Sequence, residues 1–157
     1  EKDHPSFRQG SAAFTRHLRQ IPGLLEQVTA FYRGLFHSLG LDSEDMPQEL
    51  ANGIYEQVVN LGQGGHTRYL QRICNAFNYN RKTGTRLFHD LKEDGALGTL
   101  TRAALRVLIE KRTTQAVLVH ALNGAQAMHY INLAAGNETQ RCFLDGWLTR
   151  TYDPEAV

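Results

Sequence analysis

The residues with the clearest capacity for chemistry lie in and just before segment 75–86, "NAFNYNRKTGTR". Six side chains form a candidate basic patch: Arg68, Arg72, Tyr79, Arg81, Lys82 and Arg86. Cationic side chains of this kind contact phosphates, and a tyrosine ring stacks on a base. The acidic residues Asp90, Glu93 and Asp94 follow at once. We therefore keep two hypotheses for the patch, a nucleic-acid contact and a solvated loop or protein-facing surface.

The seven histidines do not predict a metal centre. Ligands on a helix recur at spacings of three or four residues. Only His89 and Glu93 have that spacing, and a helix-surface contact explains them equally well. His120 and His129 share one apolar stretch but fall on different faces, so we expect hydrogen-bonded core histidines. The sequence predicts no metal and no cofactor.

No set of residues predicts a catalytic site. A nucleophile needs an adjacent base and an orienting group. Beyond residue 11 only Ser38 and Ser43 offer a serine hydroxyl, neither in a nucleophile-elbow sequence. The glycine-rich turn at 62–65 has no lysine, unlike a phosphate-binding loop. The sequence favours binding over catalysis, and no catalytic residue is assigned.

The surrounding segments are predicted to be helices, because apolar residues recur at spacings of three and four. Helical patterns cover residues 11–20, 24–39, 49–61, 66–78, 99–109, 113–136 and 137–148, with a short one at 87–91 ending near Gly95. Thr99 or Thr101 is expected to cap the helix over 99–109. Residues 114–135 are apolar almost all round, which indicates a buried central helix.

These patterns predict an all-α fold, a compact single-domain bundle of about six to eight helices around that central helix. We expect a polar lead-in at 1–10, one helical domain at 11–150 and a C-terminal tail at 151–157. The sequence resembles the middle of death-effector-type domains in the leucine spacing of residues 86–111. It lacks that family's charged motif at 112–115, so the sequence alone assigns no family.

Composition limits the partners further. The net charge of +1 excludes a strongly basic, DNA-seeking chain. Cys74 and Cys142 lie in apolar helical contexts, so we expect buried, reduced thiols and favour a reducing intracellular compartment. No apolar run is long enough to span a membrane. The chain begins with Glu, so we expect a processed product or part of a longer protein.

The sequence thus predicts a non-enzymatic helical domain that binds another protein, of the effector, adaptor or scaffold type. The first alternative is a nucleic-acid-binding domain that uses the basic region 68–86. The second is a hydrolase-type enzyme whose catalytic groups meet only in the folded chain.

Overall fold

The computed structural model describes residues 11–44 and 46–151. Within these residues the chain contains seven α-helices, one 3₁₀ helix and no strand, which confirms the all-α fold class. The chain forms two compact units, residues 1–41 and 42–157. Each unit is described by itself, and the single domain expected over 11–150 stays a prediction.

The first unit contains α2 (Ser11–Arg19) and α3 (Leu24–Ser38). Residues 20–23 separate the two helices, and Gly23 before α3 has a left-handed φ of 73°. None of the fifteen residues of α3 is buried. Leu25 and Phe31 are 74% and 68% exposed. The apolar stripe that the sequence places on this helix is therefore a surface feature.

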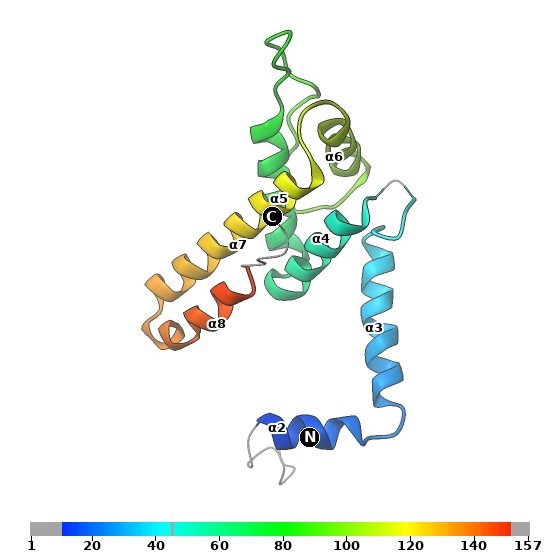
Figure 1. The fold of residues 1–157 in the computed structure, drawn as a ribbon, viewed down its shortest axis with the longest axis vertical. Coiled ribbons are helices and arrows are strands. Elements are labelled where there is room, and N and C mark those ends of the chain that lie inside the picture. The colour runs from blue at the N-terminus through cyan, green and yellow to red at the C-terminus, as the bar shows by residue number, and fades with distance from the viewer. Residues whose placement is uncertain (1–10, 45, 152–157) are drawn as a thin grey trace. The chain divides into compact units, whose positions relative to one another are not determined.

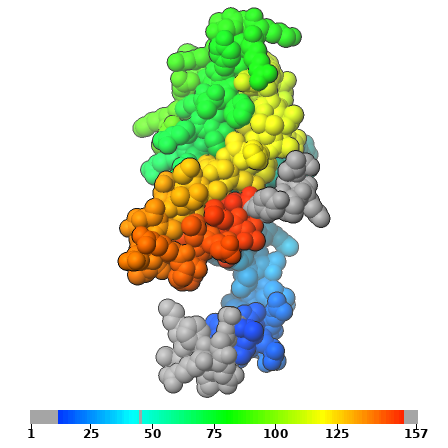
Figure 2. Space-filling view, turned by 60° about the vertical axis from the view of Figure 1, so that its left-hand side comes forward, coloured from blue at the N-terminus to red at the C-terminus, as the bar shows by residue number. Residues whose placement is uncertain are grey.

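The second unit holds the remaining helices (Figure 1). They are α4 (Gln48–Leu61), α5 (Gln63–Phe77), α6 (Thr99–Lys111), α7 (Gln115–Gly136), the 3₁₀ helix η1 (Glu138–Phe143) and α8 (Leu144–Thr149). Helix α7 contacts α4, α5, η1 and α8, so it is the central helix of this unit. Figure 2 shows η1 and α8, orange to red, lying against α7.

The core forms mainly where α4 meets α7. Leu50 and Ile54 of α4 are fully buried, as are Leu118 and Leu122 of α7. Each pair is separated by four residues, so both side chains lie on the same face of their helix. Removing these aliphatic side chains from water is the main stabilising contribution of the interface.

Burial of α7 is confined to one stripe. Its buried residues are spaced four apart: Leu118, Leu122, Gln126, Tyr130 and Ala134. Apolar side chains on its other faces are exposed, among them Met128 at 55% and Val117 at 45%. Because the sequence of α7 is apolar on all faces, it did not predict which face would be buried and which would be exposed.

Two local predictions are wrong. Residues 78–98 contain no helix, although the leucine pattern predicted a short one at 87–91. Helix α6 begins after Gly98, and neither Thr99 nor Thr101 caps it. Asn137 caps η1, because its Oδ1 accepts a hydrogen bond from Thr139 N–H at 3.1 Å.

Candidate binding site

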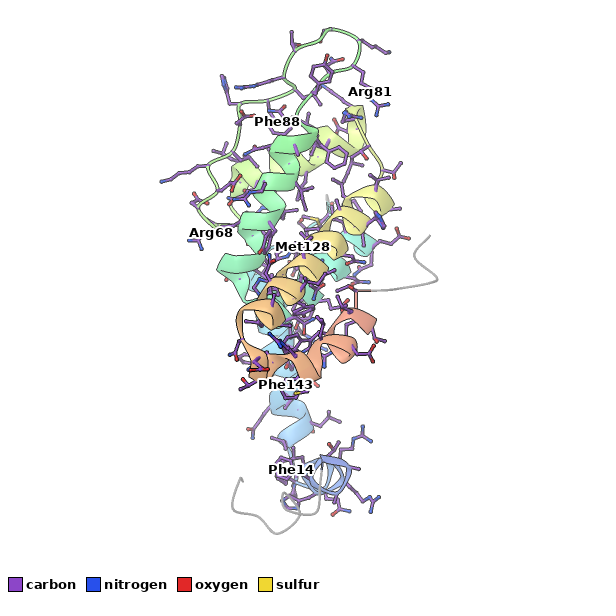
Figure 3. The ribbon with its side chains drawn as sticks, turned by 90° about the vertical axis from the view of Figure 1, so that its left-hand side faces the viewer. Phe14, Arg68, Arg81, Phe88, Met128 and Phe143 are labelled. Carbon is purple, nitrogen blue, oxygen red and sulfur yellow. The ribbon has the colours of Figure 1, made fainter. Side chains whose placement is uncertain are left out.

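The structure does not gather the six patch residues into one cluster. Arg68 projects from α5, whereas Arg81 lies in the loop that follows, well away from it (Figure 3). Lys82 is exposed beside Arg81, and Tyr79 is 50% exposed. The basic patch is thus spread along α5 and the loop.

Two of the six patch residues are already paired with the acids that follow in the sequence. Arg72 donates from Nε and Nη2 to Oε2 of Glu93, at 3.0 and 2.7 Å. Nη2 of Arg86 lies 3.2 Å from Oδ2 of Asp90. These two acids neutralise part of the positive charge, which weakens attraction for phosphate. Arg68, Arg81 and Lys82 have no acidic partner within 4.0 Å in the described ranges.

Asn80 closes the tip of the loop. Its Oδ1 accepts hydrogen bonds from the backbone N–H groups of Lys82 and Thr83, at 2.9 and 3.4 Å. Its backbone N–H donates to the carbonyl of Thr85 at 2.8 Å. Side-chain acceptance two and three residues ahead is how asparagine stabilises a turn. Asn80 therefore shapes the loop rather than offering its amide to a ligand.

Asn78 and Asn75 attach the chain after the loop to α5. The amide of Asn78 donates to Phe88 O and accepts from the N–H groups of Leu87 and Phe88, at 2.7 to 3.0 Å. Asn75 exchanges a matched pair of hydrogen bonds with Leu91, donating to its carbonyl at 2.9 Å and accepting from its N–H at 2.7 Å. These amides satisfy backbone N–H and C=O groups of residues 87–91, which lie in neither a helix nor a strand.

Gln71 continues the same attachment one turn earlier. Its Oε1 accepts from Gly95 N–H at 2.9 Å, and its Nε2 donates to Asp94 Oδ1 at 2.8 Å and to Ala96 O at 3.2 Å. Gly95 has a φ of 82°, and a Cβ there would meet Gly64 O at 2.9 Å. Only glycine suits both the backbone conformation and this close approach.

Gln71 and Asn75 are four residues apart on one face of α5, and Asn78 is the residue that follows the helix. Their partners run in the opposite order, from residues 94–96 through 91 to 87–90. Residues 87–96 therefore form an extended segment that returns antiparallel along α5, which we call the return segment. This role was not predicted from the sequence. The spacing of Gln71, Asn75 and Asn78 in the sequence could have indicated that a chain segment binds along this helix.

A groove of about 250 Å³ opens where the return segment leads into α6. It is lined by Gln71, Leu91, Lys92, Asp94, Ala96, Gly98, Thr99, Leu100 and Thr101. Leu100 is 77% exposed at the edge of this groove. The amide of Gln71 is fully engaged within the protein, so exposed side chains and the apolar wall remain for a ligand.

The two charges of the groove differ in their surroundings. Asp94 Oδ1 accepts from Gln71 Nε2 and from Ala96 N–H, both within 2.9 Å. These hydrogen bonds, that of Gln71 first, lower the pKa of Asp94, so its carboxylate is ionised and fixed. The Lys92 ammonium has no ion pair within 4.0 Å in the part of the chain that the structure describes. Its positive charge contributes to the lowered pKa of Asp94, and its side chain is exposed to solvent.

A second polar cluster is sealed inside the unit. Gln57 Nε2 donates to Asn123 Oδ1 at 3.2 Å, so the Gln57 oxygen, 3.0 Å away, accepts from Nδ1–H of His66. His66 is 0% exposed, and its Nε2 has no hydrogen-bond partner. Burial lowers the pKa of His66 to about 4. The imidazole is therefore neutral at pH 7 and helps join α4, α5 and α7.

The histidines that were predicted to lie in the core behave differently. His129 is half-buried, with Nδ1 3.4 Å from the Tyr69 hydroxyl. His120 is exposed, so its predicted core position is wrong. Within the described residues no group of three or more His, Cys, Asp or Glu could hold a metal ion.

The two thiols also differ. Cys74 is fully buried, and burial raises its pKa to about 12. Cys142 is exposed in η1, so the prediction of two buried thiols is wrong at that position. No described helix has the length and apolarity needed to cross a membrane.

Aromatic rings hold the C-terminal elements on α7. Trp147 of α8 packs against Tyr130 of α7 with ring centroids 5.3 Å apart, and Phe143 of η1 stacks on Trp147 at 5.9 Å. Phe143 is 53% exposed and forms the open end of this stack (Figure 3). Offset and stacked rings of this kind add to the energy of apolar burial.

Residues 65–152 match the family described as "Predicted Peptidoglycan domain". The matched range runs from the first turn of α5 through α8 and covers more than half of the chain. The chain belongs to this family. Comparison with curated proteins and with solved structures gives no match. The matched range includes the return segment, the groove and the aromatic stack, whereas α2, α3 and α4 precede it.

Proposed function

We propose that the second unit is a non-catalytic module that binds peptidoglycan. The observation that carries this proposal is the family match over residues 65–152. It is supported by a groove built from the matched residues and held in shape by amides of α5. A rigid scaffold that presents a partly exposed surface is the usual arrangement of a binding module. A peptidoglycan ligand also implies work at a cell wall, outside the reducing compartment that the cysteines favoured.

Sedimentation with purified, insoluble peptidoglycan tests this function. The full 157-residue chain is mixed with the polymer at physiological salt, and the bound fraction is measured in the pellet. We expect saturable binding to peptidoglycan and none to cellulose or chitin of matched particle size. Equal binding to all three polymers, or none to peptidoglycan, contradicts the proposal. Release of soluble fragments from the pellet would contradict its non-catalytic part.

A protein partner is a second proposal for a different surface. Several large apolar side chains of α7 are exposed, among them Met128 and Ile131 at 55% and 41%. Contiguous exposed apolar surface is typical of contact sites. Replacing both residues by Ser should abolish binding to such a partner and leave peptidoglycan sedimentation unchanged.

The basic patch remains a third proposal, because Arg81 and Lys82 keep exposed charges at the loop tip. If nucleic acid binds there, affinity for an oligonucleotide should fall steeply with salt. Replacing Arg81, Lys82 and Arg86 by Gln should then reduce the slope of that dependence. No retention of the wild-type chain at low salt rejects the proposal.

A further inference from the structure

We propose that the groove between the return segment and α6 binds the short peptide of peptidoglycan through a free carboxylate of that peptide. The inference rests on the proposed function and assigns a site and a chemical component to it. Lys92 supplies the complementary charge, and Leu91 and Leu100 supply an apolar wall for alkyl side chains.

The groove offers a ligand carboxylate one cationic side chain, Lys92. The carboxylate of Asp94 is oriented by Gln71 and the backbone of Ala96, so it belongs to the scaffold. The ammonium of Lys92 has no ion-pair partner among the described residues. A ligand carboxylate can therefore bind Lys92 without displacing an internal partner, which makes a charge-assisted hydrogen bond available for binding.

The size and lining of the groove favour peptide over glycan. Its volume of about 250 Å³ lies below the roughly 300–1,000 Å³ that is usual for drug-sized ligands. A groove of this size holds only part of a stem peptide, such as the carboxylate and one alkyl side chain beside it. Sugar rings pack on exposed aromatic faces, yet no aromatic residue lines the groove. The peptide is also the part of peptidoglycan that carries free carboxylates next to small alkyl side chains.

Leu100 is the second reason to assign a ligand here. It lies in the first turn of α6 with 77% of its surface exposed, although it borders a groove that also contains Leu91 and Ala96. Covering an exposed leucine of this kind with an alkyl group of a ligand stabilises a complex by removing apolar surface from water. The groove thus offers a ligand both a positive charge at Lys92 and an apolar surface at Leu100.

The test uses a synthetic stem tetrapeptide of peptidoglycan with free carboxylates, titrated into the full chain by calorimetry or NMR. We expect binding that weakens about tenfold in Lys92→Gln, the size of one lost charge-assisted hydrogen bond. Lys111→Gln is the matched control. Lys111, at the end of α6, is exposed like Lys92 but lies outside the groove. The control variant should bind the peptide as the wild type does.

Leu100→Ser provides an independent variant, with an expected loss of several-fold in peptide affinity from reduced apolar contact. Both replaced side chains are exposed, so thermal midpoints should match the wild type and rule out misfolding. The same peptide with its carboxylates converted to carboxamides should bind weakly, and equally to wild type and Lys92→Gln.

The outcomes separate this inference from the proposed function. Sedimentation with insoluble peptidoglycan but no binding of the tetrapeptide overturns the groove assignment and leaves the function standing. The groove assignment is also overturned if Lys92→Gln and Lys111→Gln bind the peptide equally, or if a peptide-free glycan fragment competes for the groove. Failure to sediment and failure to bind the peptide overturn both proposals.

Discussion

Two attachments within the second unit, α7 on α4 and the return segment on α5, use different interactions. Helix α7 packs on α4, and both helices contain fully buried aliphatic side chains, among them Leu122 and Ile54. The return segment is held on α5 by the amides of Gln71, Asn75 and Asn78. The first is non-directional and depends on volume, whereas the second depends on the position of each donor and acceptor.

This difference determines how each attachment responds to substitution. Burying one leucine contributes about 2 kcal/mol, and a shortened side chain leaves a cavity that adds to the loss. A hydrogen bond contributes only about 1 kcal/mol net, but an unpaired buried group costs more than that. Substitutions in the apolar interface should therefore weaken the whole unit, and substitutions in the amide series should open one segment.

The largest effect is expected for Leu122→Ala. The side chain is fully buried in the stripe that α7 presents to its neighbours, so its truncation should lower the free energy of unfolding by about 3 kcal/mol. Urea denaturation followed by circular dichroism measures the change. Val117→Ala, at a 45% exposed position of the same helix, is the control and should lose less than about 1 kcal/mol. Equal losses at both positions would mean that the apolar stripe is misassigned.

The second prediction concerns His66, a buried polar residue where α5 meets α4. Burial lowers its pKa from 6.5 to about 4, so as pH falls below 6.5 the unfolded chain takes up a proton that the folded chain does not. Proton uptake by the unfolded state alone favours unfolding. Stability should therefore decrease between pH 6.5 and 4, by about 3 kcal/mol in all for this group.

The measurement is the free energy of unfolding at several pH values for wild type and His66→Gln. The variant lacks the titrating imidazole, so it should lose much less stability between pH 7 and 5, where most carboxylates remain ionised. Parallel curves for the two proteins would show that His66 is not the group responsible.

The next largest loss of stability is expected for Asn78→Ala, which removes one of the amides that hold the return segment. It removes bonds to both backbone N–H groups of residues 87 and 88 and to the Phe88 carbonyl. We expect a loss of about 2 kcal/mol. Hydrogen exchange should accelerate selectively at 87–91. Asn80→Ala at the exposed loop tip is the matched control and should leave the exchange of those amides unchanged. Uniform acceleration across the unit would instead indicate that the return segment and core open together.

The helices were predictable because their signals are local. Apolar spacing placed α4, α5, α6 and α7 within a few residues of their observed limits, and Pro22 and Gly23 separate α2 from α3. The return segment was not predictable in this way. Leu87, Phe88 and Leu91 have helical spacing, but the amides that pair with their backbone lie about ten or more residues away, on α5 and just after it. Tertiary hydrogen bonds outweighed local propensity.

The candidate site was predictable only in part. Charge density directed attention to Arg81 and Lys82, which are exposed as expected, but could not show that Arg72 and Arg86 are paired with acids. The groove depends on how the return segment enters α6, and no spacing along the chain encodes that junction. Lys92 is one of four lysines, and nothing in its neighbours along the sequence marks it as a groove residue.

The smallest effect is expected for Arg72→Gln, which removes the ion pair with Glu93 that also joins α5 to the return segment. The arginine side chain is 68% exposed, so water and salt screen the pair and its loss leaves no buried group unpaired. The urea midpoint should match the wild type, and exchange at 87–91 should stay slow. If Arg72→Gln opened the segment as much as Asn78→Ala does, then charge would hold the return segment rather than the directed amides. The contrast between the two attachments would then become one between apolar burial and electrostatics.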